Sequence, residues 1–305
     1  MLTEMSDPFN NLVTESRAGH DDLDLRSARD LVALMNEADA TVAGAVAGEL
    51  DAIAGAVEGI AGRLRAGGRL VYVGAGTSGR LAAVDAAECA PTFNIDPGVI
   101  RAVVAGGPDA VHTSIEEAED DPNAGRGDLA ALAVSGSDAV VGVSASGRTP
   151  YVIGALALAR EVGALTVALS CNAGAEVSGL ADHPIEVRVG PELIAGSTRL
   201  KAGTAQKMVL NMFSTAAMIR LGRTYGDLMV DVRSENEKLR ARALRVVRAA
   251  TGAGDSEAAE ALAAGDHDAA VAVVMLRAGV DATTARSTLE AARGNVREAI
   301  DKARR

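Results

Sequence analysis

The chain has few aromatic side chains: three Tyr, three Phe and no Trp among 305 residues. Proteins that bind single-stranded nucleic acid, or a sugar polymer in a groove, stack their ligands on such rings, so this scarcity argues against both classes. Positive charge is also scarce, because 30 Lys and Arg stand against 41 Asp and Glu, for a formal net charge of −11. A basic surface for nucleic acid is therefore not expected, and a ligand should be small and held by polar groups.

Cysteine, histidine and long apolar runs are scarce as well. Cys89 and Cys171 cannot form a disulfide framework and are expected to be buried, and the four His have no metal-ligand spacing, so no metal site is expected. Acidic residues within the first ten positions argue against a secretory signal. The most apolar stretch, residues 151–171, is interrupted by two charged residues and predicts no membrane span. We expect a cytoplasmic protein.

The chain does contain enough apolar sequence, 48% of its residues, for a sizeable core. Apolar side chains at three- and four-residue steps predict a helix over residues 28–66. Short apolar runs predict strands over 69–74, 99–105, 138–144, 165–170 and 184–189. Because helical segments separate these runs, we expect an α/β fold with a mainly parallel sheet covered on both faces.

The last part of the chain is predicted to be a small all-helical domain. A long helix over about 198–221 and a second around 235–249 precede the flexible stretch 251–255, which is the predicted boundary. Beyond it, Ala258, Leu262, Ala269, Ala272 and Val273 recur 27 residues later as Ala285, Leu289, Val296, Ala299 and Ile300. This repeat predicts two stacked helical pairs. The predicted division is 1–50 for an N-terminal segment and helix, 51–250 for the α/β domain and 251–305 for the helical domain.

Two loops follow predicted strands and precede predicted helices. Residues 74–79 read Gly-Ala-Gly-Thr-Ser-Gly, and residues 144–149 read Ser-Ala-Ser-Gly-Arg-Thr. Each offers hydroxyl groups and backbone N–H groups at the positive end of a helix, where anions bind. The first loop lacks the Walker lysine and the ribose-binding acid of a dinucleotide site. A capped turn is the alternative for either loop alone, but two such loops on one sheet favour a phosphate site.

Two glutamates are candidates for proton transfer. Glu88 lies at the far end of the helix after the first loop, among apolar neighbours that would raise its pKa. Glu119 lies in the acidic cluster 116–121, for which a solvated helix end is the alternative. Glu88 is ten residues after Ser78, about 15 Å along a helix, which is too far for one sugar phosphate to bridge. A site that contains both glutamates therefore needs a bent segment or a second subunit.

The stretch 190–207 places three cations near the predicted start of a long helix, against the preference of the helix dipole. They are Arg199, Lys201 and Lys207. Cations at such a position indicate an anion nearby, with a solvated basic turn as the alternative.

Several motifs, taken together and in this order, resemble the N-acetylmuramic acid 6-phosphate etherase family. They occupy residues 14–17, 74–80, 85–93, 116–120, 144–152, 190–207, 210–215 and 229–232, so the resemblance covers nearly the whole chain. It implies a sugar isomerase (SIS) domain, which is a flavodoxin-like three-layer α/β sandwich that binds phosphosugars, followed by a small helical domain.

The resemblance also implies an activity, since this family removes D-lactate from the C3 ether of the sugar. It implies a carbon–oxygen lyase that acts by elimination and rehydration without a cofactor, in a homodimer with sites near the subunit interface. Glu88 and Glu119 are the implied catalytic residues. The implied substrate-binding residues are Thr77, Ser78, Gly79, Ser144, Ser146, Gly147 and Thr149, and Lys201 is added on its charge, as a contact for the lactate carboxylate or the phosphate.

Glu117 departs from the family pattern and is expected to raise the pKa of Glu119 if it lies close. Two other functions stay open. One is a phosphosugar aldose–ketose isomerase, and the other is a non-catalytic phosphosugar sensor of the glucokinase regulatory type. Those regulators have two SIS domains, whereas this chain has one and keeps both glutamates, so we favour the enzyme.

Overall fold

The computed structural model describes residues 12–113, 115–230 and 237–305. These residues form two compact units. The first lies within Met1–Ala87 and Gly98–Ser214, and the second within Glu88–Pro97 and Thr215–Arg305. Residues 1–11 of the predicted N-terminal segment, residues 231–232 of one motif and the first residues of the helix predicted around 235–249 lie outside the described residues.

The first unit begins with helices in place of the single helix predicted over residues 28–66. They are α1 (Ala28–Ala40), α2 (Val42–Ala47) and α3 (Leu50–Arg65), preceded by the 3-10 turns η1 (Val13–Glu15) and η2 (Leu23–Leu25). The prediction of one helix is wrong, because the chain bends by 64° between α2 and α3. Gly44 and Gly48 weaken the helix there, and Glu49 leaves helical geometry with φ −111° and ψ 9°.

The first unit is built on a five-stranded parallel sheet. The strands are β1 (Leu70–Gly74), β2 (Ile100–Val104), β3 (Ala139–Val143), β4 (Leu165–Ser170) and β5 (His183–Glu186). Their order is β2-β1-β3-β4-β5, and every neighbouring pair is parallel. All five predicted strands and the parallel sheet are thus confirmed. From β1 the chain first adds β2 on one side of β1 and then adds β3, β4 and β5 on the other side. We call the place between β1 and β3, where the strand order reverses, the reversal point; ligands of such sheets bind there, beyond the carboxyl ends of the strands.

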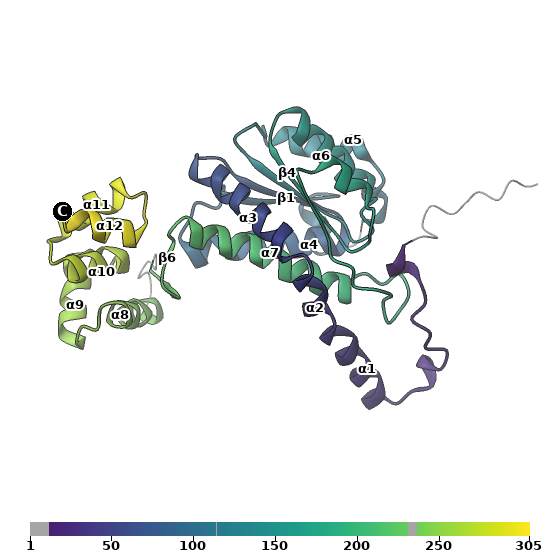
Figure 1. Ribbon diagram of the computed structural model, residues 1–305, viewed down its shortest axis with the longest axis horizontal. Coiled ribbons are helices and arrows are strands. Elements are labelled where there is room, and N and C mark those ends of the chain that lie inside the picture. Colours follow the sequence, from purple (N-terminus) through teal and green to yellow (C-terminus); the bar gives the residue numbers. More distant parts are fainter. Residues whose placement is uncertain (1–11, 114, 231–236) are drawn as a thin grey trace, which may run out of the picture. The chain divides into compact units, whose positions relative to one another are not determined.

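Helices cover both faces of this sheet. They include α4 (Gly76–Phe93), α5 (Pro122–Ala131), α6 (Pro150–Glu161) and α7 (Lys201–Arg220), and the 3-10 turns η3 (Pro108–Val111), η4 (Glu116–Glu119) and η5 (Glu176–Leu180) lie between elements. Figure 1 shows α5 and α6 on one side of the strands and α3, α4 and α7 on the other. Val71 and Val73 pack with the residues of α5 and α6, whereas Tyr72 between them donates a hydrogen bond to Asp85 of α4. The predicted three-layer α/β sandwich is confirmed.

The second unit is helical apart from one short antiparallel hairpin, β6 (Thr224–Tyr225) with β7 (Leu228–Met229). Its helices are α8 (Glu237–Thr251), α9 (Asp255–Ala264), α10 (Ala269–Ala278), α11 (Ala282–Ala291) and α12 (Val296–Ala303). All ten positions of the 27-residue repeat are buried in its core. Ala243 and Val247 of α8 belong to the same core, so this unit begins earlier than the segment 251–305.

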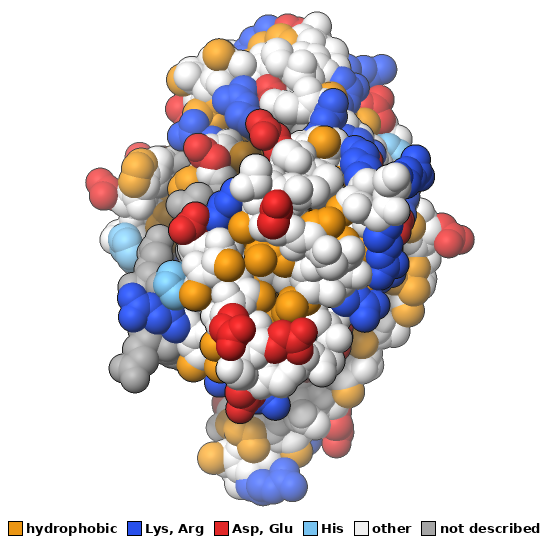
Figure 2. Space-filling view, turned by 90° about the vertical axis from the view of Figure 1, so that its left-hand side faces the viewer, with side chains coloured by type: hydrophobic (Ala, Val, Ile, Leu, Met, Phe, Trp, Pro, Cys, Tyr) orange, Lys and Arg blue, Asp and Glu red, His pale blue; other side chains and the backbone are white. Residues whose placement is uncertain are grey.

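Figure 2 faces helices α8 to α12 and shows hydrophobic side chains near the centre of the view, with Lys and Arg gathered along one side. Within this unit, Arg245 and Arg248 of α8 line a surface hollow together with Ala249, Gly252 and Ala253. Arg248 is paired with Asp255 at the start of α9, at 2.5 Å. The ion pair joins the end of α8 to the next helix.

The residue types that are scarce in the sequence are placed as follows. Both cysteines are buried as predicted, and burial raises the pKa of Cys171 to about 12.

No group of three or more His, Cys, Asp and Glu side chains among the described residues has a metal-binding arrangement. Within the same ranges no single helix is long and apolar enough to span a membrane, although the bent pair Ala28–Ala47 and Leu50–Arg65 has the length and composition to do so.

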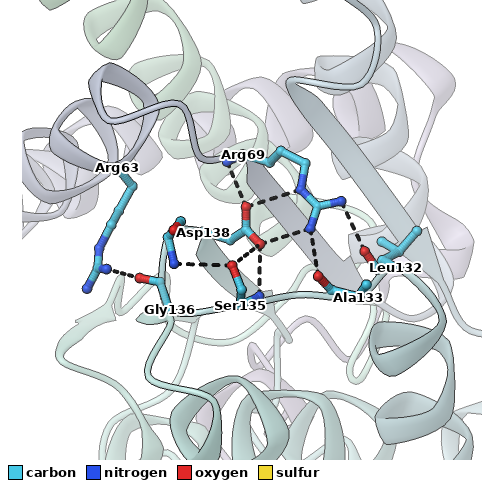
Figure 3. A network of polar contacts seen from close by, with 8 residues as sticks. Arg63, Arg69, Leu132, Ala133, Ser135, Gly136 and Asp138 are labelled. Carbon is cyan, nitrogen blue, oxygen red and sulfur yellow. Dashed lines mark hydrogen bonds and ion pairs between the residues drawn. The ribbon is translucent and has the colours of Figure 1, made fainter.

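An ion-pair network fixes the starts of β1 and β3 (Figure 3). The carboxylate of Asp138 accepts hydrogen bonds from the backbone N–H of Arg69 at 2.8 Å, from its guanidinium at 2.9 and 3.1 Å, and from the N–H of Ser135 at 2.9 Å. The Arg69 guanidinium also donates to the carbonyl oxygens of Leu132 and Ala133. Burial alone would raise the pKa of Asp138, but these donors outweigh burial and hold the pKa below its ordinary value.

Replacing Asp138 by Asn is therefore expected to lower the free energy of unfolding at pH 7 by about 3 kcal/mol, because it leaves the Arg69 charge without its partner. A carboxylate with a lowered folded pKa stabilises the fold above its unfolded pKa and loses this effect as the pH falls through the folded pKa. The difference between the two proteins should consequently shrink in acid. Urea denaturation at several pH values measures both effects. The control is Glu161→Gln, which removes the exposed ion pair to Arg126 and should cost less than about 1 kcal/mol.

Candidate active site

The two predicted loops leave the sheet side by side. β1 and β3 are neighbours, with Gly74 opposite Val143, so residues 74–79 and 144–149 follow the carboxyl ends of adjacent strands. Each loop leads into a helix, α4 after the first and α6 after the second. The structure therefore places both loops at the reversal point of the sheet, where two helix N-termini can act on one anion.

The first loop turns into α4 at Gly76 and meets Glu119 there. Gly76 has φ +53°, and a Cβ at this position would lie 2.7 Å from Oε1 of Glu119. Glycine thus permits the left-handed turn and also makes room for the carboxyl group. The structure brings Glu119 of η4 to the N-terminus of α4, although 43 residues separate Glu119 from Gly76 in the sequence.

The predicted binding residues of the first loop lie in the first turn of α4. Ser78 is only 7% exposed, and its hydroxyl donates to Oε1 of Gln206 on α7 at 3.0 Å. Thr77 is half-buried, and its methyl group lies near Gly203 of α7. Gly79 is buried against Gly74. The first turn of α4 therefore packs against α7, with the Ser78 hydroxyl held by a residue from a distant part of the chain.

Ser144 is the centre of the second loop. Its hydroxyl lies 2.8 Å from that of Thr149 and 3.3 Å from that of Ser146, and it accepts the backbone N–H of Gly147 at 3.0 Å. Gly147 has φ +72°, and a Cβ there would lie 2.3 Å from the Cβ of Ala175, so no other residue fits this turn. The three predicted hydroxyl groups thus gather at the N-terminus of α6.

Glu119 lies in surroundings that favour its protonated form. Its side chain is half-buried, and burial raises its pKa. The negative charges of Asp120 and Glu116 act in the same direction, whereas Arg80 of α4 opposes them. The expectation that Glu117 raises the pKa of Glu119 is not supported, since Glu117 is exposed and the charges of Glu116 and Asp120 have this effect instead. The alternative of a fully solvated acidic cluster does not describe Glu119.

Glu88 differs from Glu119 in its surroundings. It lies on α4 within the part assigned to the second unit, and its side chain is exposed. The apolar neighbours expected from the sequence do not enclose it in the single chain. Ser78 and Glu88 belong to one helix, which continues to Phe93 with Pro91 inside it. Ten residues of this helix place the two about 15 Å apart along its axis.

The anion expected near the start of α7 is part of the chain itself. Glu192 is fully buried, and its carboxylate accepts the backbone N–H groups of Lys201 and Ala202 at 3.0 and 2.9 Å. A carboxylate at this position is favoured by the helix dipole. Lys201 is only 8% exposed, and its ammonium group donates to the carbonyl oxygen of Val189 at 2.6 Å. A contact of Lys201 with a ligand stays a prediction.

A buried amide that sequence reasoning missed links the second loop to the N-terminal segment. Asn172, just after β4, donates to the carbonyl oxygen of Ala145 at 3.0 Å and to the hydroxyl of Thr14 at 2.9 Å. The backbone of Thr14 in turn accepts the N–H of Gly196 at 3.0 Å. Asn172 follows the carboxyl end of β4, at the same edge of the sheet as the two loops. This position after a predicted strand is the sequence feature that could have identified it as a candidate site residue. The motif 14–17 thus lies beside the second loop.

A buried carboxylate connects α4 to α7 and β1. Asp85 accepts hydrogen bonds from Asn211 at 2.6 Å, from Ser214 at 3.0 Å and from Tyr72 at 2.8 Å. Burial raises the pKa of Asp85, while these donors and the charge of Lys207 lower it in part. Together with the bond from Ser78 to Gln206, these contacts form a polar seam between α4 and α7, and they fix the position of α4 beside the loops.

Comparisons with known proteins agree with this architecture. Residues 52–160 match the model of the glucokinase regulatory protein N-terminal SIS domain, and residues 123–216 match the SIS domain model. A phosphoheptose isomerase from Francisella tularensis has a similar fold, with a TM-score of 0.52 at 19% identity over 64% of this chain and 100% of that one. This likeness extends to the fold alone.

Closer relatives cover almost the whole chain. An N-acetylmuramic acid 6-phosphate etherase from Streptomyces avermitilis is 56% identical over 93% of this chain and 91% of its own length. One from Rubrobacter xylanophilus is 54% identical over 99% of this chain and 100% of its own. One from Mycolicibacterium smegmatis is 53% identical over 92% of this chain and 94% of its own length. On this identity over almost the whole length of the chain, together with a parallel sheet and two hydroxyl-bearing loops at its reversal point, the chain belongs to the N-acetylmuramic acid 6-phosphate etherase family.

Proposed function

We propose that the protein cleaves the C3 lactyl ether of N-acetylmuramic acid 6-phosphate, as a carbon–oxygen lyase, and forms N-acetylglucosamine 6-phosphate and D-lactate. The observation that carries this proposal is the identity of 54–56% to two curated etherases over 93–99% of the chain. The α/β unit supports it with a site of the right chemical kind, since hydroxyl groups and two helix N-termini at one sheet edge suit a phosphosugar.

The phosphate is proposed to bind at the second loop, with Ser78 beside it. At the start of α6, the Ser144 hydroxyl lies 3.3 Å from the hydroxyl of Ser146 and 2.8 Å from that of Thr149. Hydroxyl donors together with free N–H groups of a helix N-terminus bind phosphate oxygens without a cation. Thr77, Gly79 and Gly147 shape the same surface and complete the proposed set of binding residues.

Glu119 is proposed as one acid–base residue of the elimination. In the open-chain sugar a base takes the C2 proton, the C3–O bond breaks, and an acid protonates the departing lactate oxygen. Water then adds across the C2–C3 double bond, with oxygen at C3 and a proton at C2, so that atoms balance. Each half of this sequence requires a group that can accept and return a proton, and the raised pKa of the Glu119 carboxyl group suits it to this role.

The second acid–base residue is proposed to come from another subunit. Glu88 lies about 15 Å along α4 from Ser78, so it does not reach the sugar whose phosphate is bound near Ser78 of the same chain. In a homodimer with sites at the subunit interface, Glu88 of the partner subunit supplies this group. Its exposure in the single chain is what such an arrangement requires.

Incubation with N-acetylmuramic acid 6-phosphate in deuterated water tests the proposal. We expect release of D-lactate and a sugar product with deuterium at C2, measured by enzymatic lactate assay and by NMR. Failure to release lactate contradicts the function, and unlabelled C2 contradicts the route through a C2 carbanion. A ketose phosphate formed without lactate would identify an isomerase. Because residues 52–160 match a regulatory protein domain, phosphosugar binding without turnover is the result that would identify a sensor.

A further inference from the structure

The side-chain nitrogen of Gln206 has no hydrogen-bond partner in the core of the first unit. Among the described residues it is the one buried side-chain nitrogen or oxygen left in this state, and the Gln206 side chain is fully buried. The other end of the same amide, Oε1, accepts the Ser78 hydroxyl at 3.0 Å. A buried donor without an acceptor lowers the free energy of unfolding, so this orientation of the Gln206 amide is energetically unfavourable.

The direction of this hydrogen bond matters for ligand binding. A serine hydroxyl has one proton, and Ser78 directs it to Gln206, so Ser78 faces any ligand only as an acceptor. The oxygens of a phosphate dianion are acceptors too and need donors. With its proton directed to Gln206, Ser78 is therefore mismatched to the ligand that the proposed function assigns to it.

A half-turn of the amide about its Cγ–Cδ bond removes the mismatch. The two ends of the amide are nearly equal in size, so the turn places Nε2 where Oε1 now lies, 3.0 Å from the Ser78 oxygen. Nε2 then donates to Ser78, and the Ser78 proton becomes free to donate to the ligand. The turn leaves Oε1 unpartnered instead, and buried carbonyl oxygens tolerate this better than N–H groups do.

We propose that Gln206 is a positioning residue that reverses its hydrogen bond with Ser78 when a phosphosugar binds, so that Ser78 donates to a ligand oxygen. The proposal rests on the phosphosugar site of the proposed function and deepens it. α7 lies close to α4 at this point, since a Cβ at Gly203 would make ordinary van der Waals contacts of 3.6 Å with the Thr77 methyl and 3.8 Å with Leu81. The proposed change is a rotation of the Gln206 amide alone.

Two variants of Gln206 separate this role from a structural one. In Gln206→Glu, assayed at about pH 9 so that the buried carboxyl group is ionised, the carboxylate can only accept the Ser78 proton, and the Kd of N-acetylglucosamine 6-phosphate should rise more than about tenfold. In Gln206→Met both ends of the amide are lost and the Ser78 proton is free, so the Kd should rise by less than about threefold. Isothermal titration calorimetry of the full chain measures both values. The KM should follow the Kd while kcat changes little, because a binding contact is altered.

The added charge of the Glu variant needs its own control. Lys207→Gln changes the net charge by the same amount at the next residue, whose side chain is exposed, and should leave the Kd within about threefold of the original. In a Ser78→Ala background, Gln206→Glu should add no further loss, because its effect acts through the Ser78 hydroxyl. Circular dichroism and melting temperature identify a variant that is merely unfolded, and the Ser78→Ala pair then still provides the comparison.

Equal weakening by the Glu and Met variants would overturn the proposal, and so would an unchanged Kd in Gln206→Glu or an additional loss in the Ser78→Ala background. Failure of the proposed function gives a different result. A protein that binds N-acetylglucosamine 6-phosphate but releases no lactate would refute the etherase activity and still test Gln206. A protein that binds no phosphosugar would refute both.

Discussion

The Glu119→Gln variant is expected to release D-lactate from N-acetylmuramic acid 6-phosphate about 10³-fold more slowly than the unmodified protein, measured as kcat/KM. Gln matches Glu in size, so it fits beside Gly76 at the start of α4, where a Cβ would lie 2.7 Å from the Glu119 carboxyl oxygen. It cannot accept or return a proton. The loss should therefore appear mainly in kcat, with little change in the Kd of the product sugar phosphate.

Stability and pH dependence separate this loss from damage to the fold. Burial raises the pKa of Glu119, so its charged form opposes folding, and its contribution to stability is present at low pH and lost as the pH rises through the raised pKa. At neutral pH the Gln variant should consequently be at least as stable as the original.

The limb of the pH–rate profile that Glu119 controls should lie above an ordinary carboxyl pKa. Glu117→Gln is the control, because the exposed Glu117 side chain should change kcat/KM by less than about threefold. Wild-type lactate release by Glu119→Gln would refute the assignment.

Mixing two inactive variants should restore activity if each site uses both subunits. Glu88→Gln and Glu119→Gln homodimers are each expected to be inactive, but random exchange makes half of the dimers mixed. Each mixed dimer holds one site with both glutamates intact, so the mixture should regain about a quarter of the activity of the original protein. The physical reason is the length of α4, which keeps Glu88 about 15 Å from Ser78 of its own chain.

The control for this experiment mixes the original protein with the double variant. A mixed dimer of these two carries one altered glutamate in each shared site, so its formation should lower the activity of the original subunits. Sites within single chains give the opposite pattern, with no recovery in the first mixture and no loss in the second. Different affinity tags on the two variants allow the mixed dimers to be isolated before assay, and inactive mixed dimers would contradict the shared site.

The sequence predicted the sheet well because each strand is a short apolar run that ends at glycine, serine or a turn. It failed where backbone geometry depends on small differences. Residues 28–66 keep their apolar spacing throughout, yet the chain bends by 64° after α2, near Gly48 and Glu49. Spacing reports which face of a helix is apolar and says little about whether the axis stays straight.

The candidate site was predictable only in part, for a related reason. The loops 74–79 and 144–149 are local patterns of residues, and their meeting follows from adjacent strands. The partners of their side chains are distant in sequence: Gln206 is 128 residues from Ser78, and Asn172 is 158 residues from Thr14. Glu192 was overlooked because a lone acidic residue gives no signal until its helix is in place.

The unbroken course of α4 restricts how this protein can change during evolution. One residue inserted or lost between Ser78 and Glu88 would rotate the glutamate about the axis of α4 by about 100° and shift it along the axis by about 1.5 Å. A substitution on the exposed face of this stretch would cause no such displacement. A change of length in this stretch of α4 would therefore move Glu88 relative to Ser78, whereas a change of length in a loop outside the helix would leave their separation unaltered.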